Sequence, residues 1–151
     1  GALKRFLQEY KYTPAPEFAS LFFPEIIVVD DDLEVLKMMG TALRKKIGAS
    51  ASVMEFSNGF DALVRVGKSV PDVAVVDVVM AQMDGLKVCE AIRRSEGGEH
   101  VHLILVTGQH NPNFEAHARS LSAVYLTKPV NVLELTGLVN AALEIRTGAL
   151  S

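Results

Sequence analysis

The sequence predicts an α/β fold, a doubly wound five-stranded parallel sheet with five helices. Two observations lead to this prediction. From residue 25 onward, short apolar segments rich in β-branched residues alternate with longer segments whose apolar residues recur every three or four positions. Glycine, asparagine and other turn-forming residues separate several of these segments. Strands that alternate with helices at such spacings form βαβ units, whose strands run parallel within one sheet.

The predicted strands are short, and two of them are continuous apolar runs. Ile26–Val29 and Val73–Val76 contain no polar residue, which is typical of strands that are buried on both faces. Each of these two runs is followed directly by an aspartate. The five predicted strands are Ile26–Val29, Ser52–Phe56, Val73–Val76, Val101–Val106 and Val124–Leu126.

The predicted helices are recognised by their apolar spacing and by their ends. In the first helix, Leu36, Met39 and Leu43 fall on one face, and Gly48 stands where a helix C-cap is expected. Gly97 and Gly98 end the third helix in the same way. The five predicted helices are Leu33–Ile47, Phe60–Val66, Leu86–Arg94, Phe114–Leu121 and Val132–Ile145.

The first 24 residues differ from the rest of the chain. Apolar residues between Leu3 and Tyr10 fall at helical spacing, and two prolines follow them. This pattern predicts a short amphipathic helix and a linker, and it leaves open whether the helix packs on its own domain, frays or binds a partner. The predicted division is an N-terminal extension at 1–24, one domain at 25–147 and a tail at 148–151.

Composition excludes several classes of function. The formal net charge is −3, whereas a nucleic-acid surface normally shows as a basic excess. Cys89 is the only cysteine, so no disulfide can form within the chain and nothing indicates an oxidising compartment. No apolar run is long enough to cross a bilayer. We therefore expect a cytoplasmic protein without membrane insertion and without direct nucleic-acid binding.

Polar residues follow four of the predicted strands. Asp30 and Asp31 come after the first, Asp77 after the third, Thr107 after the fourth and Lys128 shortly after the fifth. Because functional groups of such sheets gather at the carboxyl ends of the strands, we expect these side chains to converge. Clustered carboxylates repel one another unless a cation lies between them, and Mg²⁺ prefers oxygen ligands. A metal, an ammonium and a hydroxyl are the groups that stabilise a transferring phosphoryl group.

Five segments resemble the receiver domains of two-component response regulators. They occur in the order of that family, and the resemblance covers Glu25 to about Arg146. The segments are Ile26–Asp32, Pro71–Asp77, Met83–Gly85, Leu105–Gly108 and Tyr125–Pro129. The resemblance implies a flavodoxin-like fold of the receiver type. It also implies that the chain accepts a phosphoryl group in a phosphorelay.

The resemblance assigns the phosphoacceptor and the metal ligands. By position, Asp77 is the phosphoacceptor. Mg²⁺ is expected to be held directly by Asp31 and Asp77, through water by Asp30, and by the main-chain carbonyl of Val79. The family has a proline where this chain has Ala81, so the loop after the acceptor is less restrained here.

The resemblance also assigns the switch. Lys128 is expected to pair with the acceptor carboxylate and later with a phosphoryl oxygen, in front of a cis bond to Pro129. Thr107 is expected to bind another phosphoryl oxygen and to move toward it, and Tyr125 to follow Thr107 inward. The domain would assist its own phosphorylation and dephosphorylation without being a turnover enzyme.

The family also implies partners for the domain. The expected phosphodonor is a histidine kinase or a histidine phosphotransfer domain. Phosphorylation is expected to change the surface of the fourth helix, the fifth strand and the fifth helix, toward a downstream protein, a fused effector domain or a second copy of the chain.

Two other functions remain as alternatives. The run Asp30–Asp32 fits by letter the nucleophile motif of haloacid-dehalogenase phosphatases, in which Asp30 would be the nucleophile, but Glu34 stands where that family expects threonine or valine. The second alternative is a receiver-like docking module that is never phosphorylated. Within the acidic run, Asp32 is predicted to cap the following helix.

Overall fold

Five parallel strands form one sheet in the order β2-β1-β3-β4-β5. The computed structural model describes residues 23–80, 83–108 and 112–147. From β1 the chain adds β2 on one side, and it then adds β3, β4 and β5 on the other side. The carboxyl ends of β1 and β3 are therefore the topological switch point of the sheet. The strands are β1 Glu25–Val29, β2 Ser52–Phe56, β3 Val73–Asp77, β4 His102–Thr107 and β5 Val124–Thr127.

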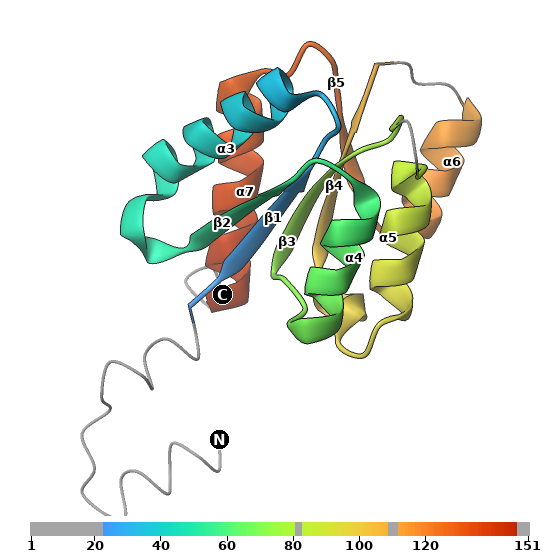
Figure 1. Cartoon of the computed structure of the whole chain (residues 1–151), viewed down its shortest axis with the longest axis horizontal. Coiled ribbons are helices and arrows are strands. Elements are labelled where there is room, and N and C mark those ends of the chain that lie inside the picture. The colour runs from blue at the N-terminus through green and yellow to red at the C-terminus, as the bar shows by residue number, and fades with distance from the viewer. Residues whose placement is uncertain (1–22, 81–82, 109–111, 148–151) are drawn as a thin grey trace, which may run out of the picture.

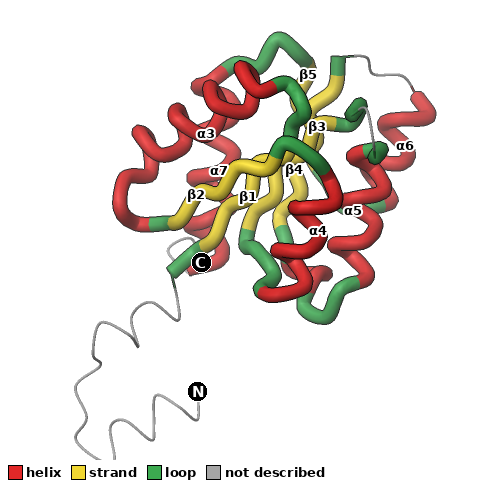
Figure 2. Tube along the Cα trace, in the orientation of Figure 1, coloured by secondary structure: helices red, strands yellow, loops and turns green. Residues whose placement is uncertain are grey.

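Helices cover both faces of the sheet (Figure 1). Two of them pack on one face, α3 (Leu33–Ile47) and α7 (Val132–Thr147). Three pack on the other, as the tube in Figure 2 also shows: α4 (Gly59–Lys68), α5 (Gly85–Arg94) and α6 (Pro112–Ser120). Short 3₁₀ turns occupy Gly48–Ser50 and Gly98–His100. None of the helices within the described ranges is long and apolar enough to cross a membrane.

The central strands divide their side chains between two hydrophobic clusters. Ile26 and Val28 of β1 point into the cluster under α3 and α7, whereas Ile27 and Val29 point into the cluster under α4, α5 and α6. All four side chains are fully buried. This alternation explains why β1 is apolar at every position of the run, since each face of the strand needs its own apolar residues.

The predicted architecture is confirmed, with small differences at the ends of the elements. The helix predicted at Phe60–Val66 is longer in the structure and spans Gly59–Lys68. It begins one residue earlier because the Asn58 side chain caps it by accepting a hydrogen bond from the backbone N–H of Asp61. Gly48 ends α3 with a φ of 65°, as its predicted position at the C-cap requires.

Some predictions concern residues that lie outside the described ranges. Residues 1–22 of the amphipathic helix and linker predicted at 1–24 belong to this group, as does Ala81 in the loop after β3. The division into an extension, a domain and a tail therefore stays a prediction.

Candidate functional site

The sheet brings three carboxylates together at its carboxyl edge. Asp77 is the last residue of β3, and Asp30 follows the last residue of the adjacent β1. One carboxylate oxygen each from Asp30, Asp31 and Asp77 lie within 4.8 Å of one another. Asp30 is fully buried and Asp77 is 3% exposed, whereas Asp31 is open to solvent.

The Asp30 carboxylate accepts a hydrogen bond at one oxygen and faces the Lys128 ammonium at the other. Its Oδ1 accepts a hydrogen bond of 2.9 Å from the backbone N–H of Asp32. Its Oδ2 is buried and accepts no hydrogen bond within the described part of the chain. Burial raises the pKa of this carboxyl, and the backbone hydrogen bond and Lys128 partly oppose that rise. A buried carboxylate oxygen without a donor is suited to a cation.

Asp77 is a more basic carboxylate than an ordinary aspartate. Burial, and after it the negative charge of the neighbouring Asp30, raise the pKa of this carboxyl to about 6. Lys128 and a hydrogen bond from the backbone of Val79 act in the opposite direction. Its side chain is therefore ionised at neutral pH while keeping enough basicity to act as a nucleophile.

Lys128 supplies the positive charge of the site. Its Nζ lies 3.3 Å from Asp77 Oδ1 and 3.5 Å from Asp30 Oδ2. The backbone fixes this placement, because the N–H of Lys128 donates a 2.8 Å hydrogen bond to the carbonyl of Thr107 on the neighbouring strand. The peptide bond that joins Lys128 to Pro129 is cis, as expected.

Thr107 lies at the end of β4, beside this cluster, whereas Tyr125 is the second residue of β5. Thr107 closes β4 and is 2% exposed. The Tyr125 hydroxyl donates a 3.0 Å hydrogen bond to Glu115 on α6. Its ring meets the ring of Phe114 edge to face, with the centroids 5.3 Å apart. Of the two residues predicted to form the switch, Tyr125 therefore contacts α6 directly.

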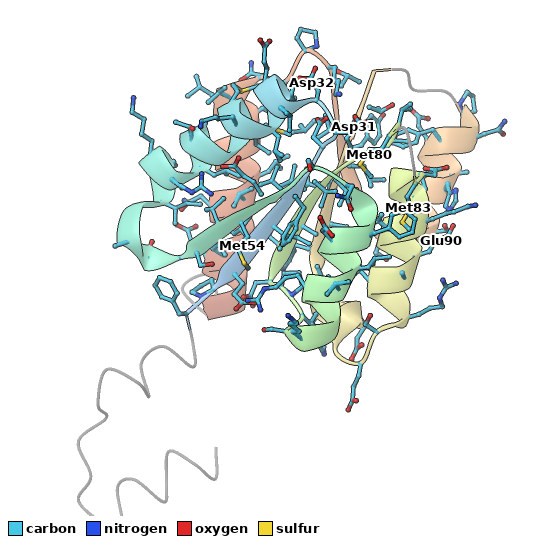
Figure 3. The ribbon with its side chains drawn as sticks, in the orientation of Figure 1. Asp31, Asp32, Met54, Met80, Met83 and Glu90 are labelled. Atoms are coloured by element: carbon cyan, nitrogen blue, oxygen red, sulfur yellow. The ribbon has the colours of Figure 1, made fainter. Side chains whose placement is uncertain are left out.

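The other two aspartates of the acidic run, Asp31 and Asp32, make different contacts. Asp32 Oδ1 accepts hydrogen bonds from the backbone N–H groups of Glu34 and Val35, so Asp32 caps α3 as predicted. Asp31 contributes to the carboxylate cluster instead. Figure 3 shows both aspartates at the N-terminal end of α3, with Asp31 nearer to the end of β3.

A cavity of about 710 Å³ opens beside the carboxylates. Asp77, Thr107 and Lys128 line one part of it. The remainder is lined by residues of the segment after β3, of α5, of the turn after β4 and of α6, namely Val78, Val79, Leu86, Gly108, Asn113, Phe114 and His117. Asp77 is thus buried within the sheet edge yet reachable through this opening.

Sequence reasoning missed two features of the site. Gly85 has no room for a side chain, because a Cβ atom at this position would overlap the main-chain carbonyl oxygen of Asp77. His117 contacts another helix, with its Nε2 2.8 Å from Glu90 Oε1 on α5. Only the Met-Asp-Gly triplet around Gly85 could have signalled the first feature. No sequence signal links two residues 27 positions apart.

The donor set fits a magnesium ion. It consists of carboxylate oxygens, one of them buried without a hydrogen-bond donor, with an open cavity beside Asp77. Oxygen ligands and room for water are what Mg²⁺ requires. The cluster of Asp30, Asp31 and Asp77 therefore has the residues to hold such an ion.

Comparisons with known proteins agree with this geometry. The model of the response regulator receiver domain family matches residues 26–140. The protein PilG of Pseudomonas aeruginosa is 29% identical over 116 residues, which cover 76% of this chain and 84% of PilG. The response regulator MprA of Mycobacterium leprae is 31% identical over 120 residues, which cover 78% of this chain and 50% of MprA. This chain therefore spans about half the length of MprA.

A solved structure shares the fold. The CheY-like response regulator receiver domain protein from Methanospirillum hungatei superposes with a TM-score of 0.74 over 85% of this chain and 99% of that one, at 21% identity. Neither rival function is favoured by these matches, which are all to receiver domains or to response regulators that contain one. The chain therefore belongs to the response regulator receiver domain family of two-component signalling.

Proposed function

We propose that this domain accepts a phosphoryl group on Asp77 from a phosphohistidine and uses it to change a partner-binding surface. One observation carries the proposal. The buried Asp77 carboxylate is paired with Lys128 and lies beside two further aspartates at an open edge of the sheet. No other residue combines a raised pKa of about 6 with access to that cavity among the residues that the structure describes.

The transfer needs only the groups around Asp77. A carboxylate oxygen forms a bond to phosphorus while the P–N bond to the donor imidazole breaks. The electron pair of that bond stays on the imidazole nitrogen, which takes up a proton from water. Lys128 balances the charge of the phosphoryl oxygens, and the Thr107 hydroxyl donates a hydrogen bond to one of them. Each domain accepts one group per cycle, so it acts as an acceptor rather than as a turnover enzyme.

Asp31 and Asp77 would hold the magnesium ion, together with the main-chain carbonyl of Val79, and Asp30 would act through water. When bound, the ion neutralises negative charge on the carboxylates and on the incoming phosphoryl group. The Asp30 oxygen that accepts no hydrogen bond among the described residues and the exposed position of Asp31 support this assignment.

The donor would dock on the groove between α3 and α7. This groove has a volume of about 840 Å³, and Met38, Ala42 and Leu133 contribute apolar side chains to it. Leu133 is 83% exposed. The N-terminal ends of both helices lie at the same edge of the sheet as Asp77 (Figure 1), so a helical donor seated there could present its histidine to the acceptor.

The output surface would be formed by α6, β5 and α7. Tyr125 would leave Glu115 and turn inward as Thr107 approaches the phosphoryl group. This would alter the surface offered to a downstream protein, to a fused effector domain or to a second copy of the chain. A cytoplasmic location remains a prediction from the composition.

The test is the intact mass of the protein after incubation with acetyl phosphate, with and without Mg²⁺. We expect one added phosphoryl group, lost on chelation of the metal and lost in Asp77→Asn. Asp61→Asn serves as the control, because Asp61 is exposed on α4. An adduct that survives in Asp77→Asn but disappears in Asp30→Asn would favour the phosphatase mechanism. No adduct on the wild type in the presence of Mg²⁺ would favour the unphosphorylated docking module.

The docking surface is tested separately. Leu133→Glu should slow phosphorylation by a histidine phosphotransfer domain at least several-fold and leave the acetyl phosphate reaction unchanged. Equal rates with the protein donor for this variant and for the wild type would contradict the proposed groove.

A further inference from the structure

The inference concerns α6, the helix that carries Glu115 and borders the cavity. Of its nine residues, only Phe114 and Ala118 are buried. A helix with so little buried apolar surface depends on its other contacts to keep its position. The position of α6 is therefore sensitive to the side chains that tie it to the rest of the domain.

One such tie links α6 to α5. His117 Nε2 lies 2.8 Å from Glu90 Oε1, and both side chains are about one third exposed, at 38% and 34%. The two residues come from separate helices, so this contact fixes the distance between helices and not the geometry of one helix. Figure 3 shows Glu90 on the outer side of α5, facing α6.

One partner of this contact, His117, also lines the cavity beside Asp77. Leu86 of α5 and His117 of α6 both line this cavity, together with Asp77 and Thr107. Only residues 108–111 separate Thr107 from the first residue of α6. A change in the position of Thr107 would therefore act close to the start of α6, the helix that Glu90 contacts through His117.

We propose that Glu90 and His117 form a brace that holds α6 in its unphosphorylated position and sets how readily the phosphorylated conformation is reached. The inference rests on the proposed phosphorylation of Asp77. The brace acts only if it is made in the unphosphorylated state and weakened in the other, because a contact that is equal in two states shifts neither. The pair would thus be a regulatory contact and not a part of the chemistry.

The first experiment measures the brace without any phosphoryl group. Amide hydrogen exchange of residues 113–120 is compared in the full chain for wild type, Glu90→Ala, His117→Ala and the double variant. We expect exchange about two- to fivefold faster in each single variant, the range of a partly exposed polar contact, and no further increase in the double variant. The control is Glu99→Gln, since Glu99 also pairs with a histidine, His100, but within one short turn. Unchanged exchange in Glu90→Ala would overturn the brace.

The second experiment measures how the Glu90–His117 brace affects the change to the phosphorylated conformation. Binding of beryllofluoride with Mg²⁺, a phosphoryl mimic, is titrated by calorimetry on the same variants. We expect about two- to fivefold tighter binding in Glu90→Ala and His117→Ala and no change in Glu99→Gln. Faster exchange with unchanged affinity would overturn the regulatory role.

The two experiments also separate this inference from the proposed function. If wild type and variants all fail to bind beryllofluoride, the proposed acceptor role fails and the regulatory role falls with it. If the wild type binds but the variants bind no better, the acceptor role stands and the brace has no regulatory effect.

Discussion

The Lys128 ammonium lies 3.3 Å from a carboxylate oxygen of Asp77. It is also 3.5 Å from Asp30, so one cation faces two buried carboxylates. The raised pKa of both acids indicates that this single charge does not fully offset their burial. The two carboxylates are thus only partly neutralised, and a second cation bound between them would stabilise their ionised forms.

Lys128→Met should lower the free energy of unfolding by about 1–3 kcal/mol in the presence of a chelator, because two buried carboxylates lose their counter-charge. Added Mg²⁺ should restore part of the loss, since an ion that binds only the folded state stabilises it. Urea denaturation with and without Mg²⁺ measures both effects. Lys68→Met, at an exposed position on α4, is the control and should change stability by less than about 0.5 kcal/mol. If Lys128→Met were as stable as the wild type in the presence of a chelator, Lys128 would not be the counter-charge that stabilises the two carboxylates.

Asp77→Asn should become more stable than the wild type as the pH rises. The pKa of Asp77 is about 6 in the folded protein and 3.8 as its ordinary value, so between these values the folded state binds more protons than the unfolded state. Ionisation of Asp77 therefore lowers wild-type stability as the pH rises from about 4 to about 6, and the loss is complete above that window.

The variant lacks this ionisation. Its advantage in free energy of unfolding should be near zero at pH 4 and reach about 1–3 kcal/mol at pH 7 with a chelator present. Chemical denaturation across this pH range is the measurement, with Glu96→Gln as an exposed control. A difference between Asp77→Asn and wild type that does not vary with pH would show that burial does not raise this pKa.

Substitutions of the adjacent residues Asp31 and Asp32 should affect different properties, Mg²⁺ affinity in the first case and stability in the second. Asp31→Asn should weaken Mg²⁺ binding by at least about tenfold, since it removes one charge from the cluster, and should leave stability nearly unchanged. Asp32→Ala should keep the Mg²⁺ affinity but lose about 1 kcal/mol of stability, because α3 loses its N-cap. Calorimetric titration and urea denaturation of both variants test this. If Asp31→Asn lowered stability and Asp32→Ala weakened Mg²⁺ binding, Asp32 rather than Asp31 would be the metal ligand.

Gly85→Ala should destabilise the domain by more than about 3 kcal/mol, because the new methyl group would overlap the Asp77 carbonyl at the end of β3. Gly137→Ala is the matched control. Gly137 lies inside α7 with nothing near its missing Cβ, so alanine there should stabilise by about 0.5–1 kcal/mol. Thermal unfolding of the two variants measures both. A well-tolerated Gly85→Ala would mean that the loop after β3 can move away from α5.

Local patterns were sufficient to predict the order of the elements. The continuous apolar run Val73–Val76 predicted a strand buried on both faces, and all five residues of β3 are buried. The cap at Asp32 and the left-handed Gly48 also depend on neighbours within a few residues. The roles of Asp77, Thr107, Lys128 and Tyr125 came from the resemblance to the family and stay predictions for this chain.

The sequence by itself determined the secondary structure, its alternation and the residues that end each strand, because these depend on side chains close to one another in the chain. Only the tertiary structure decided that Glu90 meets His117, that Glu115 receives the Tyr125 hydroxyl and that Gly85 packs against Asp77. Such contacts depend on how helices are placed against the sheet. That placement is set by the packing of the whole core, which no short stretch of sequence encodes.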